Sequence, residues 1–216
     1  MNKKNSLVVD KTATYFTLGN IKTAKTIWFV LHGYGYLAEF FIKKFEPITN
    51  NETCVIAPEA LSHFYLDGFY GKVGASWMTK HNREDEIVDY INYLQKLYDF
   101  VLSENNKNCT KINVVGFSQG GATACRWFSA KKFTCTNFIL WASVFPDDVE
   151  FNLAQSETKL FLIYGTQDEF LTEERMSRLK KQILESKVAC KVITFDGKHG
   201  IPKDVLIEES VKNVWN

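Results

Sequence analysis

The chain lacks the features that mark membrane-spanning, secreted or nucleic-acid-binding proteins. No apolar stretch approaches the length of a membrane span, and residues 1–10 have a basic start but no apolar run of signal-peptide length. The formal net charge is only +1, and no cluster of Lys and Arg forms a basic stripe. These absences argue against integral membrane contact and against a nucleic-acid partner. We therefore expect a cytoplasmic protein.

Cysteines are few and scattered, and they form no CxxC pair. Their odd number predicts reduced, mostly buried thiols in place of disulfides or metal ligands: Cys54, Cys109, Cys125, Cys135 and Cys190. No metal site is expected from them. The chain also has no internal repeat, low-complexity tract or Pro/Gly/Ser-rich linker. Its 216 residues are enough for one core, so we expect a single domain over residues 1–216.

Apolar runs alternate with amphipathic stretches along the chain. Buried strands are predicted at 26–31, 53–57, 112–115, 138–142, 159–164 and 190–195, and an edge hairpin is predicted from 7–9 and 12–18. Helices are predicted at 38–46, from a cap at Asn82 and Asp85, from a cap at Thr172 to about Ser186, and from Pro202 to Trp215. This alternation predicts an α/β fold, with a mostly parallel central sheet and helices on both faces.

Residues 59–80 form a long stretch with no regular pattern, rich in aromatic residues and glycine. Long loops in compact domains usually carry function. Two interpretations stay open, a roof over a site or a surface loop held by its own aromatic side chains. Aromatic residues make up 14% of the chain, and we interpret most of them as core rather than as the lining of an apolar substrate pocket.

A G-x-S-x-G motif, Gly116-Phe117-Ser118-Gln119-Gly120, lies between a predicted buried strand and a predicted helix. Strand, motif and helix together are typical of a nucleophile elbow. The turn is so tight that a Cβ on either flanking glycine would collide with the neighbouring strand or helix. We therefore expect Ser118 to lie at the tip of the turn with its hydroxyl exposed.

A serine nucleophile needs a base beside it and a third group that orients the base. In folds with this elbow the chain order is serine, acid, histidine. His199, just after the last predicted strand, is the one histidine that follows Ser118. Asp168 directly follows the strand predicted at 159–164 and is the favoured acid. Asp147 and Asp148, after the preceding strand, stay open as alternatives.

Acyl transfer also needs backbone N–H donors for the oxyanion. The elbow supplies one from Gln119, the residue after the serine. The loop that follows the strand at 26–31 supplies the other, and we expect the donor to be the N–H of Tyr34. His32 in the same loop is interpreted as a structural histidine, because it precedes the serine in the chain.

Four blocks of the sequence resemble the carboxylesterase/acyl-protein thioesterase (phospholipase/carboxylesterase) family of α/β-hydrolases: residues 31–35, 116–121, 164–168 and 197–201. The resemblance covers nearly the whole chain, and the Gly-Phe-Ser-Gln-Gly-Gly block is its most specific part. It implies an α/β-hydrolase fold with a minimal cap. It also implies the catalytic set Ser118, Asp168 and His199, with Tyr34 and Gln119 as the oxyanion donors.

Two further stretches match the family and imply pocket residues. Residues 57–58 and 76–77 match one pattern, which implies that Trp77 lies near the acyl pocket. Residues 144–146 match another stretch on the pocket side and add Phe145. The chain departs from the family pattern on the substrate side of the site, at Tyr36, Met78, Thr79, Tyr164, Leu171 and Thr172.

These features together predict a serine esterase acting on a small-molecule ester or thioester. We expect short to medium acyl chains, an acyl-enzyme intermediate and no cofactor. An acyl thioesterase or lysophospholipase with the same triad is the alternative among enzymes, and a catalytically silent binding protein is the alternative from another class. A homodimer stays open, because exposed aromatics such as Trp215 or Phe69 could form its surface.

Overall fold

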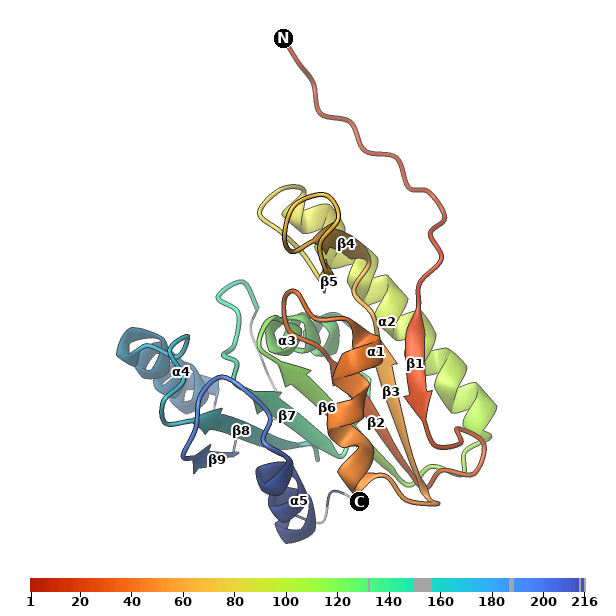
Figure 1. The fold of residues 1–216 in the computed structure, drawn as a ribbon, viewed down its shortest axis with the longest axis vertical. Coiled ribbons are helices and arrows are strands. Elements are labelled where there is room, and N and C mark those ends of the chain that lie inside the picture. The colour runs from red at the N-terminus through yellow and green to blue at the C-terminus, as the bar shows by residue number, and fades with distance from the viewer. Residues whose placement is uncertain (132, 150–156, 187–188, 214, 216) are drawn as a thin grey trace.

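A seven-stranded sheet forms the centre of the computed structural model, which describes residues 1–131, 133–149, 157–186, 189–213 and 215. Within these residues the strand order is β1-β3-β2-β6-β7-β8-β9 (Figure 1). The strands span Tyr15–Leu18 (β1), Thr26–Leu31 (β2), Thr53–Pro58 (β3), Lys111–Phe117 (β6), Asn137–Trp141 (β7), Lys159–Gly165 (β8) and Cys190–Phe195 (β9). β1 runs antiparallel to β3, and the other neighbouring pairs run parallel. The predicted mostly parallel sheet is confirmed.

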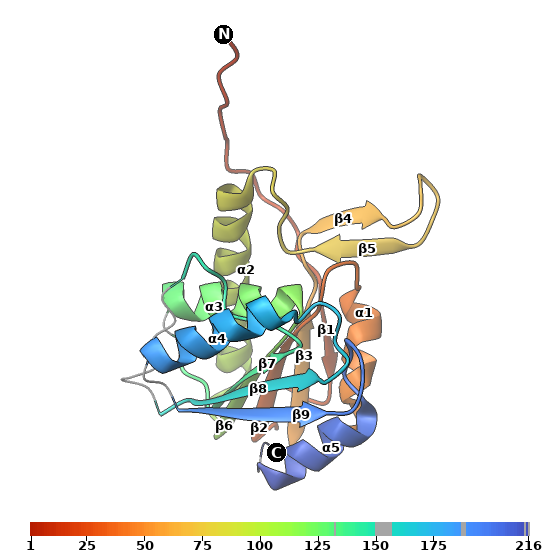
Figure 2. The same ribbon diagram turned by 90° about the vertical axis from the view of Figure 1, so that its left-hand side faces the viewer.

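The central strands are continuous apolar runs because helices cover both faces of the sheet. Every residue of β2, β3 and β7 is buried. One face carries α2 (Arg83–Asn105), α3 (Gln119–Lys131) and α4 (Glu173–Ser186), and the other carries α1 (Ala38–Phe41), the 3-10 helix η1 (Ile42–Ile48) and α5 (Lys203–Lys212), as Figure 2 shows. The sheet therefore separates two apolar clusters, one beneath each layer of helices.

The residues predicted as an irregular stretch at 59–80 include a second, two-stranded sheet. β4 (Ser62–Tyr65) pairs antiparallel with β5 (Val73–Ser76), so the prediction of a wholly irregular loop is wrong. The hairpin projects from the body of the molecule (Figure 2). Its base is pinned to the loop after β2, since Gly35 N–H donates to Ala75 O (2.9 Å) and Ala75 N–H donates to Tyr36 O (3.2 Å).

The predicted N-terminal edge hairpin is also wrong. Residues 1–14 form no strand, and only β1 joins the sheet, at its edge beside β3. Leu7, Val8 and Val9 are exposed, and the segment runs away from the body of the molecule (Figure 1). Their apolar character suggested a strand, but the fold offers them no surface against which to bury.

Two of the predicted helices differ from the structure, one in its continuity and one in its N-terminal cap. The helix predicted at 38–46 is divided into α1 and η1, and η1 contains Pro47. α2 begins after Asn82, but that residue has a left-handed φ of 53° and makes no side-chain cap. The cap predicted at Thr172 is confirmed, because Arg175 N–H donates to its Oγ1 at 3.4 Å.

The C-terminal prediction needs a correction. α5 begins at Lys203, one residue after the predicted start at Pro202, and it ends at Lys212 rather than at Trp215; residue 214 lies outside the described residues. Trp215 is fully buried against Trp28 and Phe161, so it cannot form a dimer surface. Phe69, on the β4–β5 connection, is exposed, and a homodimer stays a prediction.

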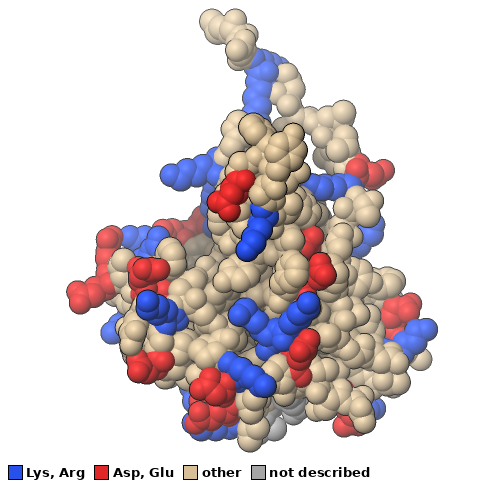
Figure 3. All heavy atoms as spheres, in the orientation of Figure 1, with Lys and Arg blue, Asp and Glu red and all other residues tan. Residues whose placement is uncertain are grey.

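The charged surface matches the balanced composition. Acidic and basic side chains are interspersed over the face seen in Figure 3. In the part of the chain that the structure describes, no helix is long and apolar enough to cross a membrane.

Candidate active site

Ser118 lies in the turn between β6 and α3 and has a left-handed backbone, with φ 54°. Such a conformation costs a non-glycine residue about 1–3 kcal/mol and persists where its surroundings impose it. Here the backbone is held on both sides. Ser118 N–H donates to Trp141 O (3.0 Å), and Ser118 O accepts from Gly121 N–H (3.0 Å) and Ser143 Oγ (2.8 Å).

The glycines of the motif allow the strand and the helix to touch. A Cβ on Gly116 would collide with Gly121 Cα, and a Cβ on Gly120 would collide with the carbonyl oxygen of Leu31 at the end of β2. No side chain can give way in either contact, because the atoms met are backbone. The predicted need for glycine at these two positions is therefore confirmed.

Asp168 and His199 meet beyond the ends of β8 and β9. Asp168 Oδ2 lies 2.8 Å from His199 Nδ1, and the side chain of Asp168 is fully buried while that of His199 is 16% exposed. The two loops pack so closely that a Cβ on Gly165 would collide with Gly197 O. With Nδ1 facing the carboxylate, the imidazole has Nε2 available as a base.

The two alternative acids are engaged elsewhere. Asp148 accepts hydrogen bonds from Arg126 Nε (3.0 Å) and from Arg83 Nη2 (2.7 Å). The hydrogen bond from Arg126 is the largest cause that lowers the pKa of Asp148 below its usual range. Asp147 pairs with Arg178 at 2.9 Å. Of the three candidate aspartates, Asp168 is the one that the structure brings to His199.

The loop after β2 lies against the serine. A Cβ on Gly33 would stand 3.2 Å from Ser118 Cβ, so the two backbones approach closely. His32 is fully buried and holds this loop, with Nδ1 2.8 Å from Gly33 O and Nε2 accepting from Ala60 N–H (3.1 Å). Burial lowers the pKa of His32, which favours the neutral ring. Its interpretation as a structural histidine is confirmed by these contacts.

The predicted oxyanion donors are Gln119, the residue after Ser118, and Tyr34, the residue after Gly33 in the loop that lies against the serine. Within the described part of the chain, the N–H groups of Tyr34 and Gln119 donate to no protein acceptor. The Tyr34 ring is exposed and stacks on Phe64 of β4, with centroids 5.0 Å apart. Both amides are therefore free to donate to an added oxygen.

The side chain of Gln119 makes structural hydrogen bonds that sequence reasoning did not predict. Its Oε1 accepts from Trp77 N–H (3.1 Å), and its Nε2 donates to Met78 O (2.8 Å). Trp77 in turn donates its indole N–H to His32 O (2.8 Å). One chain of hydrogen bonds thus joins the start of α3, the end of β5 and the loop after β2.

The two residues predicted for the acyl pocket are buried. Trp77 is 2% exposed and packs on the His32 ring at 5.1 Å. Phe145 is 5% exposed and belongs to the apolar cluster under α2 and α3. The pocket role of these two residues stays a prediction.

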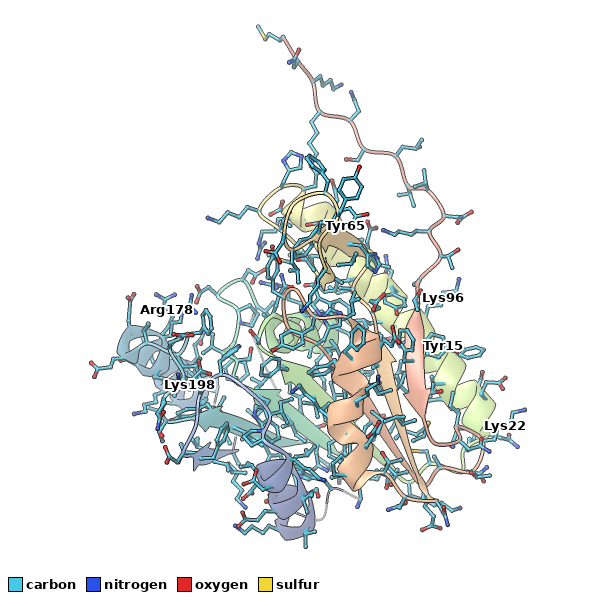
Figure 4. The ribbon with its side chains drawn as sticks, in the orientation of Figure 1. Tyr15, Lys22, Tyr65, Lys96, Arg178 and Lys198 are labelled. Atoms are coloured by element: carbon cyan, nitrogen blue, oxygen red, sulfur yellow. The ribbon has the colours of Figure 1, made fainter. Side chains whose placement is uncertain are left out.

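Sequence reasoning also missed Phe170, two residues after Asp168. Its ring contacts the His199 imidazole, with centroids 4.7 Å apart. Lys198, labelled in Figure 4, marks the loop after β9 that carries this histidine. An aromatic residue in an acid-bearing loop was the available signal, but such a residue has no characteristic spacing from the histidine.

Among the described residues, no group of three or more His, Cys, Asp or Glu side chains is placed to hold a metal ion. The five cysteines are free thiols, as predicted.

The sheet order and the strand–turn–helix around Ser118 define the chain as an α/β-hydrolase. Residues 23–211 match the serine hydrolase (FSH1) family, and the chain belongs to that family. No curated protein matches the sequence.

Solved structures agree on the fold. The chain is similar to a carboxylesterase from Mesorhizobium loti, with 15% identity, 96% of this chain and 98% of that chain covered, and a TM-score of 0.74. It is also similar to Zea mays acyl-protein thioesterase 2, with 17% identity, 94% and 98% covered, and a TM-score of 0.68. Arabidopsis thaliana SOBER1 has 20% identity, 89% and 100% covered, and a TM-score of 0.66. The predicted resemblance to carboxylesterases and acyl-protein thioesterases is thus confirmed.

Proposed function

We propose that this serine hydrolase cleaves carboxylic esters of short to medium acyl chains through Ser118, His199 and Asp168. The observation that carries the proposal is the 2.8 Å contact between His199 Nδ1 and the fully buried Asp168 carboxylate. This pair lies at the same edge of the sheet as the strained Ser118 turn. A buried carboxylate on the far nitrogen orients the imidazole as a base and stabilises its charged form.

The reaction follows from these positions. Ser118 Oγ attacks the ester carbonyl while His199 Nε2 takes the hydroxyl proton. The N–H groups of Tyr34 and Gln119 donate to the oxyanion of the tetrahedral intermediate. His199 then gives the proton to the leaving alcohol, and Ser118 keeps the acyl group as an ester. Water, deprotonated by His199, attacks this ester, and the acid leaves as His199 returns the proton to Ser118 Oγ, which regenerates the serine; no cofactor takes part.

Ser118→Ala tests the proposal directly. The variant removes the nucleophile, so turnover of p-nitrophenyl acetate and butyrate should fall by about 10³-fold or more, with an unchanged unfolding midpoint. A fluorophosphonate probe should label the parent on Ser118 and leave the variant unlabelled. Ser103→Ala, which removes a hydroxyl from the outer surface of α2, is the matched control and should keep parental turnover.

Parental turnover in Ser118→Ala would overturn the mechanism. A parent that neither turns over esters nor accepts the probe would instead favour a silent binding protein on this fold.

A thioester or a lysophospholipid is the alternative substrate class for the same residues. The similarity to an acyl-protein thioesterase fold is the observation that favours testing it. The kcat/KM values for an ester, an acyl thioester and a lysophospholipid of equal acyl length should rank the ester first. A thioester preference of about ten-fold or more would move the assignment to a thioesterase.

A further inference from the structure

Two phenyl rings contact the imidazole of His199 from different elements. Phe117, the last residue of β6, lies 5.0 Å from it between centroids, and Phe170 lies 4.7 Å from it with an interplanar angle of 62°. Phe117 is 1% exposed and is part of the core. Phe170 is 53% exposed, so core packing does not account for where its ring stands.

The backbone of Phe170 is fixed at both ends of the residue. Its N–H donates to Asp168 Oδ1 (3.0 Å), and its carbonyl oxygen accepts from Arg175 Nη1 (2.8 Å). The other oxygen of the same carboxylate holds His199 at 2.8 Å. One buried aspartate therefore positions both the imidazole and the ring that covers it.

We propose that Phe170 is a positioning residue for His199. Its ring packs against the imidazole and holds it in the orientation in which Nδ1 faces Asp168 and Nε2 is left to act as the base. This inference rests on the proposed function, in which His199 is the base. The interplanar angle of 62° is that of an edge-to-face contact, in which the positive edge of one ring meets the negative face of the other.

The contact acts most strongly when His199 is charged. An aromatic ring attracts a cation that lies over its face within about 6 Å of the ring centroid, and the proposal places the imidazole of His199 over that face. In the proposed mechanism His199 gains a positive charge when it takes the proton of Ser118, on the way to the tetrahedral intermediate. An interaction that strengthens only then raises kcat and leaves KM nearly unchanged.

Three substitutions of Phe170 distinguish the effect of the aromatic ring from the effect of side-chain volume. Phe170→Leu keeps an apolar side chain without the aromatic ring, and Phe170→Ala removes the bulk as well. Both should lower kcat for p-nitrophenyl acetate by roughly three- to ten-fold with little change in KM. Phe170→Tyr restores the ring and should return kcat to within about two-fold of the parent.

Phe100→Ala is the matched control. Phe100 is a half-exposed phenylalanine on α2, and its ring also makes a 62° contact, with Tyr15. This variant should keep parental kcat and KM. Unfolding midpoints measured for every variant show whether a loss of kcat comes from a loss of fold. If Phe170→Ala does not fold, comparison of kcat in Phe170→Leu and Phe170→Tyr still tests the need for an aromatic ring.

Parental kcat and KM in Phe170→Leu would overturn the proposal, because the aromatic ring would then be dispensable. A raised KM at parental kcat would also overturn it, because Phe170 would then bind substrate without positioning the base. Either outcome is distinct from failure of the proposed function, which would show as parental turnover in Ser118→Ala.

Discussion

At the scale of single residues, Asp168 and Asp148 have identical side chains but different roles, because their burial and their hydrogen-bond partners differ. Both follow strands of the same sheet, and both fit the chain order that a serine hydrolase needs. Asp168 is fully buried and meets an imidazole that can gain or lose a proton. Asp148 is 36% exposed and meets two guanidinium groups that stay charged. The first arrangement suits proton transfer, and the second suits a permanent ion pair.

Substitution of each aspartate by asparagine should separate the two roles. Asp168→Asn should lower kcat by about 10³–10⁴-fold, because the amide no longer holds the imidazole in the reactive tautomer. Asp148→Asn should lower turnover by less than about ten-fold but reduce the free energy of unfolding by about 1–3 kcal/mol, since Arg126 is buried and loses its charged partner. Ester turnover and denaturant unfolding at about pH 7 measure both effects.

The pH dependence of stability provides a second readout for Asp148. Its pKa is lowered in the folded protein, mainly by the hydrogen bond from Arg126. Its stabilisation is therefore complete above the unfolded-state pKa of about 3.9 and is lost as the pH falls through the lower folded-state value. Asp148→Asn should remove this loss below about pH 4. Loss of all turnover in Asp148→Asn would instead make Asp148 the triad acid.

At the scale of secondary-structure elements, the site depends on contacts between segments that are distant in sequence. Gln119 opens α3, and its side chain binds the end of β5, more than forty residues earlier, at Trp77 and Met78. Its own N–H is one of the proposed oxyanion donors. The position of that donor is thus coupled to the β4–β5 hairpin, which was predicted only as a long loop.

Gln119→Ala tests whether the proposed oxyanion donor is coupled to the β4–β5 hairpin. The variant keeps the backbone N–H but loses the side-chain hydrogen bonds, so the free energy of unfolding should fall by about 1–3 kcal/mol. The kcat/KM for p-nitrophenyl butyrate should fall by about ten-fold, because small displacements of a catalytic group are costly. Gln95→Ala is the matched control, since Gln95 accepts from the Trp127 indole far along α2. It should lose stability and keep its activity.

An equal loss of activity in both glutamine variants would contradict the coupling, because general destabilisation would then explain the effect. Parental kcat/KM in Gln119→Ala would contradict it as well.

At the scale of the whole molecule, the proposed catalytic groups lie on the loops of the central sheet, and the N-terminal segment lies apart from them. The loops after β2, β6, β8 and β9 all open at the same edge of the sheet, since these strands run parallel. Residues 1–10 lie outside this arrangement. Their side chains reach the body at Asp85, which accepts from Lys4 (3.2 Å) and Ser6 (3.1 Å) on an exposed surface.

Deletion of residues 1–10 should therefore leave the unfolding midpoint and ester turnover unchanged, because exposed ion pairs contribute little. The pKa of Asp85, which is lowered mainly by the hydrogen bond from Lys4, should rise toward its ordinary value. Titration of the Asp85 carboxyl group followed by NMR measures this shift. A large fall in the midpoint would show instead that the segment packs on the body of the protein.

The sequence by itself determined the sheet, the turn around Ser118 and the order of the candidate residues, because these depend on short-range patterns. Apolar runs identify buried strands, and glycines mark the turn where strand and helix touch. Only the tertiary structure decided which aspartate reaches His199, that β4 and β5 pair, and that Trp215 is buried. It also placed Phe170 on the imidazole. These are contacts between segments far apart in the chain, whose packing no local pattern encodes.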